Sequence, residues 1–197
     1  RANLIDVGLG YDDLGVAALR VPAGDHVFIG GAASTGKSSA LRLIARLWRS
    51  GHPEGRVIEV DRRRPLLAGP STSGRSGPLL IVVDDAERVD DVNGVLAGLV
   101  AAASPDVLIV AAGRVEAVRS AYGHWTREVA RGRCGLILTA AGDVDGDLLG
   151  VTLPRRSPLA ARPGLAWLVD GDGFRLVQLF DPGVSGPDGR GGHSAAR

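Results

Sequence analysis

Residues 26–39 read His26-Val27-Phe28-Ile29-Gly30-Gly31-Ala32-Ala33-Ser34-Thr35-Gly36-Lys37-Ser38-Ser39, and this stretch decides the fold. From Gly31 to Ser38 it matches the phosphate-binding pattern G-x-x-x-x-G-K-[ST] at every fixed position. The apolar residues before the loop predict a buried parallel strand. After it, apolar residues recur at helical spacing over residues 40–49. The stretch therefore predicts a strand, a phosphate loop and a helix in succession.

Each residue type in this loop has a physical role in holding phosphate. Glycines let successive backbone N–H groups point into one hollow, and the helix N-terminus behind the hollow favours anions. Lys37 is the single lysine of the chain, whose other 22 basic residues are arginines. We expect Lys37 to contact the outer phosphates of ATP and Ser38 to ligate Mg²⁺. The expected nucleotide-binding residues are Gly31, Ala32, Ala33, Ser34, Thr35, Gly36, Lys37, Ser38 and Ser39.

A second motif follows at residues 79–85, Leu79-Leu80-Ile81-Val82-Val83-Asp84-Asp85. Five apolar residues that end in a carboxylate are typical of a Walker-B strand, which delivers its acid to the carboxyl edge of a parallel sheet. We expect Asp84 to hold Mg²⁺, through water or through Ser38. Asp85 is expected to orient or deprotonate the attacking water. Glu87 is interpreted as part of the first turn of the next helix.

The remaining segments complete an α/β pattern. One or two short strands are expected within residues 4–21, and further strands over 56–61, 106–114 and 134–138. Helices are expected over about 90–103 and 115–130, and a β-hairpin over 164–180. Together they predict a RecA-like P-loop NTPase, with a mostly parallel sheet sandwiched by helices and a C-terminal β-hairpin. Arg114, at the end of one strand, is a candidate sensor of the γ-phosphate or an ordinary arginine at a helix start. Tyr122 and Trp125 are assigned to the core.

Length, composition and charge limit the possible domain organisation and partners of the chain. Residues 1–180 are expected to form one ATPase domain, and residues 181–197, which are polar and rich in glycine, a disordered tail. The net charge of +1 gives no whole-chain argument for nucleic acid. The single cysteine, Cys134, is predicted to be a buried, inert thiol in an intracellular protein. Because the chain begins with Arg1, we expect it to be part of a longer protein.

Residues from about 4 to 180 resemble an FtsK/SpoIIIE-type ATPase domain, in the form found in the EccC ATPases of type VII (ESX) secretion. The phosphate loop is generic, and the more specific matches lie elsewhere. They are the stretches 21–27, Val82-Val83-Asp84-Asp85-Ala86-Glu87-Arg88, Ala112-Gly113-Arg114, Gly123-His124-Trp125-Thr126-Arg127, Asp143-Val144-Asp145-Gly146-Asp147 and Arg162-Pro163-Gly164.

The resemblance implies an ATP- and Mg²⁺-binding domain that works with neighbouring ATPase domains of the same chain or of a ring, such as a hexamer. It implies a secretion substrate protein as partner, and a cytoplasmic location at the inner face of the membrane within a larger anchored protein. DNA is the alternative polymer, for a translocase motor, and a non-catalytic module with a structural nucleotide is the other alternative.

Two departures from the active motors bear on whether this domain is an enzyme. Asp85 stands where an FtsK motor has Glu, and Gly113 stands where the DNA motors carry Gln. The interval between Ser38 and Asp84 is also shorter than in DNA-pumping domains. These features favour a regulatory or substrate-docking domain, and they predict that its hydrolysis is weak or degenerate.

Overall fold

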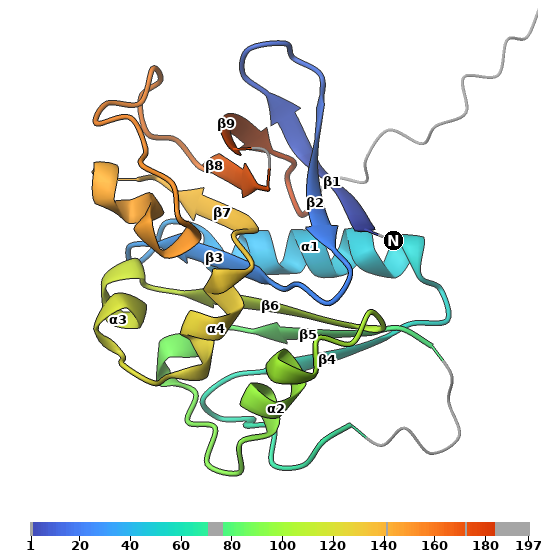
Figure 1. Ribbon diagram of the computed structural model, residues 1–197. Coiled ribbons are helices and arrows are strands. Elements are labelled where there is room, and N and C mark those ends of the chain that lie inside the picture. Colours follow the sequence, from blue (N-terminus) through green and yellow to red (C-terminus); the bar gives the residue numbers. More distant parts are fainter. Residues whose placement is uncertain (1, 71–76, 141, 172, 184–197) are drawn as a thin grey trace, which may run out of the picture.

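The computed structural model describes residues 2–70, 77–140, 142–171 and 173–183. Its strands form one nine-stranded sheet in the order β2-β1-β9-β8-β7-β3-β6-β5-β4 (Figure 1). The strands are β1 (Ala2–Gly10), β2 (Val16–Pro22), β3 (Val27–Gly31), β4 (Arg56–Val60), β5 (Leu79–Val83), β6 (Val107–Gly113), β7 (Gly135–Leu138), β8 (Leu165–Asp170) and β9 (Gly173–Leu179).

The sheet has a parallel half and an antiparallel half. Strands β7, β3, β6, β5 and β4 are parallel, whereas β8, β9, β1 and β2 continue the sheet with antiparallel pairing. β3 lies between β6 and β7, with Ile29 paired to Ala112 on one side and to Leu136 on the other. β3 and β5 are buried at every residue, as expected for parallel strands covered on both faces.

Helices cover both faces of the parallel half. α1 (Lys37–Gly51) packs on one face with Leu41, Ile44 and Trp48 buried. The opposite face carries η1 (Ala86–Arg88), α2 (Val95–Ala102), α3 (Val115–Ser120), α4 (Trp125–Arg131) and η2 (Asp143–Leu149) (Figure 1). This arrangement confirms the predicted P-loop ATPase fold and its C-terminal hairpin, β8–β9. Among the described residues, no helix combines the length and apolar character needed to cross a membrane.

Two helices differ from the sequence prediction. The helix expected over 90–103 begins only at Val95, because the Asp91 carboxylate accepts hydrogen bonds from the N–H groups of Leu96 (3.0 Å) and Ala97 (2.8 Å). Val92, which falls within the predicted helix, therefore lies outside the observed one and is 85% exposed.

The helix expected over 115–130 is interrupted between Ser120 and Trp125, where Gly123 adopts a left-handed conformation with φ 75°. Trp125 is buried, as predicted, and its indole N–H donates to the Val89 carbonyl. Tyr122 is 89% exposed, so its assignment to the core was wrong. It lies beneath the guanidinium of Arg127, 5.3 Å from the ring centre.

The structure describes the first residues of the tail predicted after residue 180. Residues 181–183 follow β9, and the backbone carbonyl of Asp181 accepts a hydrogen bond from Arg46 of α1 (3.2 Å). The rest of the predicted tail, residues 184–197, lies outside the described residues.

Candidate functional site

Four connections meet at the carboxyl edge of the parallel strands. The phosphate loop follows β3, Asp84 follows β5, Arg114 follows β6 and Thr139 follows β7. Because β3 is flanked by β6 and β7, the loop has Arg114 on one side and Thr139 on the other. Ligands bind at this edge in open α/β sheets, where strand order changes direction.

The phosphate loop ends in a helix N-terminus without a side-chain cap. Gly36, at the N-cap of α1, has φ 98°, a left-handed conformation that favours glycine. No acidic residue lies in the first turn of α1. The first N–H groups of the helix therefore have no side-chain acceptor, and their partial positive charge favours an anion.

Lys37 lies across the loop. Its side-chain ammonium donates hydrogen bonds to the carbonyls of Ala32 (2.6 Å) and Gly31 (3.2 Å), and the residue is only 7% exposed. A Cβ added at Gly31 would come within 2.5 Å of the Thr35 hydroxyl, so only glycine fits the close approach of these two residues. The compact loop thus holds its single lysine charge beside the helix N-terminus.

Ser38 and Asp84 bring the two motifs into contact. The Ser38 hydroxyl donates to Asp84 Oδ2 at 2.6 Å, and Asp84 Oδ1 accepts from the N–H of Asp85 at 3.0 Å. A hydroxyl and a carboxylate are the hard oxygen ligands that Mg²⁺ prefers, usually together with water and phosphate oxygens. The described residues contain no cluster of three or more His, Cys, Asp or Glu side chains that could hold a metal ion alone. The pair fits a magnesium ion that is shared with a nucleotide.

Asp85 lies beside Asp84 in an uncommon backbone conformation. It has φ 46° and ψ 45°, in the left-handed region where a non-glycine residue costs about 1–2 kcal/mol. Its carboxylate is 55% exposed and lies 3.8 Å from the guanidinium of Arg88. Ser34 of the phosphate loop and Thr139 also have positive φ values, of 61° and 47°. Strained residues of this kind cluster at functional sites.

Arg114 is held by an acid that the sequence analysis did not assign to the site. Its Nε donates to Glu87 Oε1 at 2.8 Å, and the Glu87 side chain is only 4% exposed. This hydrogen bond raises the pKa of Arg114 above its ordinary value. The sequence placed Glu87 in the first turn of the following helix, but in the structure it belongs to η1. Arg114 is the N-cap of α3 and also lines the cavity beside the phosphate loop, so its position is compatible with either of the roles predicted for it.

Part of this set lines one cavity of about 440 Å³, whereas Asp84 is joined to the lining through its hydrogen bond from Ser38. The cavity is lined by Ala33, Ser34, Gly36, Lys37, Ser38, Ser39, Asp85, Arg88 and Arg114. It joins the predicted catalytic residues to the phosphate loop. Arg88 is a further site residue, which was not predicted as such from the sequence. The lining is polar and charged, with three cations facing one carboxylate, as a polyphosphate site requires.

Comparison with solved structures shows where this fold occurs. The chain is similar to the cytoplasmic domain of the type VII secretion ATPase EccC from Thermomonospora curvata, with 20% identity over 90% of this chain and a TM-score of 0.66. It is also similar to ATPases 2 and 3 of EssC from Geobacillus thermodenitrificans, with 15% identity over 92% of this chain and a TM-score of 0.70. A structure of EccC ATPases 2 and 3 in complex with a signal sequence peptide matches with 20% identity over 90% of this chain and a TM-score of 0.65.

The chain thus has the fold of the EccC and EssC ATPase domains, as the sequence resemblance implied. It spans only 26%, 42% and 40% of those three chains. No protein-family model and no curated protein matches the chain.

Proposed function

We propose that this chain is an ATP-binding domain of a translocation ATPase of the EccC type. Residues Gly31–Ser39 hold the phosphates, and Ser38 and Asp84 hold Mg²⁺. The observation that carries the proposal is the 2.6 Å hydrogen bond between Ser38 and Asp84, which joins the two motifs of a P-loop ATPase in one site.

Each side chain then has a role in binding or in hydrolysis. The Lys37 ammonium exchanges the carbonyls of the loop for oxygens of the β- and γ-phosphates. Mg²⁺, when bound, neutralises developing phosphate charge. Asp85 positions the attacking water and accepts its proton, and Arg114 stabilises charge on the transferred phosphoryl group.

From the same geometry we expect slow hydrolysis by the domain alone. The Asp85 side chain is shorter than that of Glu, and it forms an ion pair with Arg88 at 3.8 Å. ATPases of this class take a further arginine from a neighbouring domain to complete the site. We therefore propose a regulatory or substrate-docking domain of residues 1–180, which acts beside other ATPase domains at the cytoplasmic face of a membrane.

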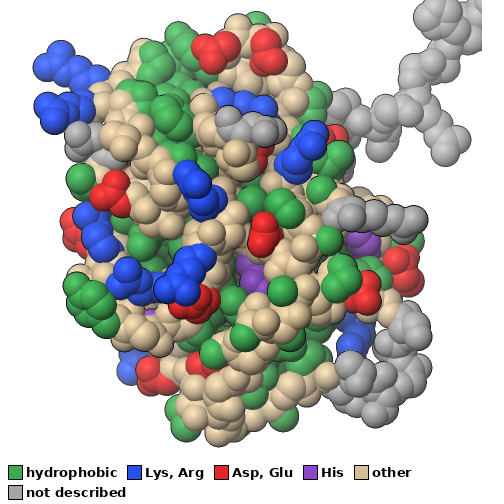
Figure 2. Space-filling model, in the orientation of Figure 1, with side chains coloured by type: hydrophobic (Ala, Val, Ile, Leu, Met, Phe, Trp, Pro, Cys, Tyr) green, Lys and Arg blue, Asp and Glu red, His purple; other side chains and the backbone are tan. Residues whose placement is uncertain are grey.

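A protein is the better candidate for the translocated polymer than DNA. On the face shown in Figure 2, basic, acidic and apolar side chains are interspersed. A DNA-translocating surface would gather Lys and Arg along one groove. The complex of EccC ATPases 2 and 3 with a signal sequence peptide suggests the class of partner, a short segment of a secreted protein.

Steady-state ATP hydrolysis tests the proposal. We expect slow turnover by this chain alone, faster turnover when a neighbouring ATPase domain is added, and no stimulation by double-stranded DNA. Stimulation by DNA that is lost with rising salt would select the DNA motor instead. Turnover at the rate of an active motor, without any partner, would contradict the regulatory role.

A further inference from the structure

Among the described residues, three cations line the cavity beside the phosphate loop, and two of them are held in place. The Lys37 ammonium donates to two loop carbonyls, and the Arg114 guanidinium donates to Glu87, whose side chain is only 4% exposed. The third cation, Arg88, forms an ion pair at 3.8 Å with the exposed carboxylate of Asp85. Both members of this pair line the cavity, so the pair lies inside the proposed phosphate site.

We propose that Arg88 distinguishes ATP from ADP by changing its partner from the Asp85 carboxylate to the γ-phosphate. This inference rests on the proposed function and deepens it, because it assigns a specificity-determining residue to the same site. The exchange replaces one ion pair in the cavity by another, and it frees the Asp85 carboxylate only when a γ-phosphate is present. ADP lacks that phosphate and leaves the original pair in place.

The ion pair between Arg88 and Asp85 is weak enough to be exchanged. The two side chains are 50% and 55% exposed, and exposed ion pairs contribute little to stability because water and salt screen them. Their separation of 3.8 Å also exceeds the roughly 2.7–2.9 Å of a charge-assisted hydrogen bond. A phosphate group carries more negative charge than a carboxylate and accepts two parallel N–H bonds from a guanidinium. A γ-phosphate in the cavity therefore competes favourably for Arg88.

The backbone of Arg88 is held on both sides, whereas its side chain is half-exposed. Its N–H donates to the Asp85 carbonyl (2.8 Å), and Ala86, at the start of η1, is fully buried. The next residue, Val89, is also buried, and its carbonyl accepts a hydrogen bond from the indole of Trp125 (3.2 Å). The exchange therefore needs only a rotation of the long Arg88 side chain about a fixed Cα, with no movement of η1.

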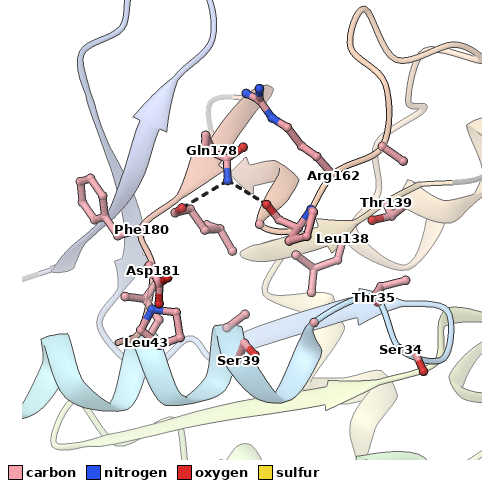
Figure 3. Close-up of a pocket in the computed structure, with 17 residues that line it drawn as sticks. Ser34, Thr35, Ser39, Leu43, Leu138, Thr139, Arg162, Gln178, Phe180 and Asp181 are labelled. Atoms are coloured by element: carbon pink, nitrogen blue, oxygen red, sulfur yellow. Dashed lines mark hydrogen bonds between the residues drawn. The ribbon is translucent and has the colours of Figure 1, made fainter. Parts of the chain in front are cut away.

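The other arginine close to the loop belongs to a different cavity. A second cavity, of about 650 Å³, lies between α1 and the β8–β9 hairpin and shares part of the phosphate loop with the first (Figure 3). Among the described residues that line it, Arg162 is the basic one, and its guanidinium points away from Ser34 and Thr35 in Figure 3. Arg88 is therefore the better candidate for the cation that responds to the γ-phosphate.

Equilibrium binding tests the exchange. Affinities are measured by calorimetry for Mg-ADP and for the magnesium complex of the β,γ-imido analogue of ATP, which keeps a γ-phosphate and is not hydrolysed. We expect Arg88→Ala to weaken the analogue at least tenfold and to leave ADP within twofold, with little change in Tm because the lost ion pair is exposed. Arg131→Ala is the matched control, since it removes an exposed i,i+3 ion pair with Glu128 on α4, and it should bind both ligands normally.

The exchange also predicts how the two residues are coupled. Because Asp85 competes with the γ-phosphate for the guanidinium, Asp85→Asn should tighten the analogue at least threefold, and the gain should be smaller in an Arg88→Ala background. Absence of a gain in Asp85→Asn would overturn the exchange. An equal or larger gain without Arg88 would also overturn it, because it would show direct repulsion between Asp85 and the γ-phosphate.

The two ligands separate failure of this inference from failure of the proposed function. Unchanged affinity for the analogue in Arg88→Ala, or equal losses for the analogue and ADP, would overturn the role of Arg88 and leave the phosphate site intact. Failure of the unaltered protein to bind either ligand would overturn the proposed function and this inference with it.

Arginine modification provides a second test that needs no substitution. The unaltered protein is treated with phenylglyoxal alone, with Mg-ADP or with the magnesium complex of the analogue, and the adducts are mapped by mass spectrometry. We expect the analogue, but not ADP, to protect Arg88, while Arg131 reacts equally in all three samples. Equal reactivity of Arg88 with ADP and with the analogue would contradict the exchange.

Discussion

Ser38 and Asp84, 46 residues apart in the sequence, are joined by a side-chain hydrogen bond of 2.6 Å. The first residue lies in the opening turn of α1, and the second follows β5 directly. The strand order places β6 between β3 and β5, so only the shared carboxyl edge of the sheet brings the two side chains together. This contact makes the effect of magnesium a direct probe of the site.

Ser38→Ala is expected to remove most of the magnesium dependence of ATP binding. The substitution deletes a ligand of the metal and leaves the loop backbone and Lys37 in place. We expect about a tenfold loss of Mg-ATP affinity, about 1.4 kcal/mol, and little change for ATP in EDTA. Ser50→Ala, at the other end of α1, is the matched control. An equal loss of ATP affinity with and without magnesium would show that Ser38 supports only the conformation of the phosphate loop.

Asp85→Glu is expected to raise the rate of hydrolysis while Mg-ATP affinity stays within a few-fold. The longer side chain brings the carboxylate nearer to the attacking water, as in the active motors that the sequence resembles. A tenfold rise in kcat corresponds to about 1.4 kcal/mol of activation free energy. Asp85→Asn is the control, since Asn also tolerates the left-handed backbone of this residue but cannot accept the proton. Lower turnover in Asp85→Glu than in the unaltered chain would contradict this role.

Arg114 and Glu87 are expected to act as a pair. Arg114→Ala removes the cation partner of a carboxylate that is 4% exposed, so it should lower the Tm and weaken ATP more than ADP. Glu87→Gln should keep the fold but release the guanidinium from its 2.8 Å contact. A double-mutant cycle on the Tm measures their coupling. Additive effects, with equal losses for ATP and ADP, would show that the pair has no link to the γ-phosphate.

Cys134 is expected to resist alkylation in the folded protein. The thiol is buried, and burial raises its pKa to about 11. At pH 8 only about one molecule in a thousand then carries the reactive thiolate, and this fraction grows as pH rises toward 11. Labelling by iodoacetamide at pH 8 should be negligible in buffer and complete in denaturant. Rapid labelling of the folded chain would show that the strand β7 region opens readily.

Local patterns in the sequence were sufficient for the nucleotide-binding motifs and most strands. A phosphate loop, a Walker-B strand and a buried apolar run each lie within about ten consecutive residues, so no knowledge of tertiary contacts is needed to find them. Their mutual placement followed from one rule, that parallel strands deliver their carboxyl ends to one edge.

Features that depend on distant contacts were not predicted. The ion pair of Glu87 with Arg114 joins residues 27 positions apart, and only the placement of η1 beside β6 reveals it. The second cavity is assembled from the phosphate loop, α1, β7, β9 and the turn before β8, and no local pattern indicates that these segments meet. The start of α2 and the break before Trp125 were missed because Asp91 and Gly123 override the apolar periodicity.

The central claim is that Lys37 and its loop bind ATP with magnesium, and calorimetry with Mg-ATP tests it most directly. We predict saturable binding of one nucleotide per chain, weakened at least a hundredfold, about 2.7 kcal/mol, by Lys37→Ala. Arg49→Ala, on an exposed part of the same helix, should bind as the unaltered protein does. Absence of binding by the unaltered chain, or equal affinity in Lys37→Ala, would contradict the account.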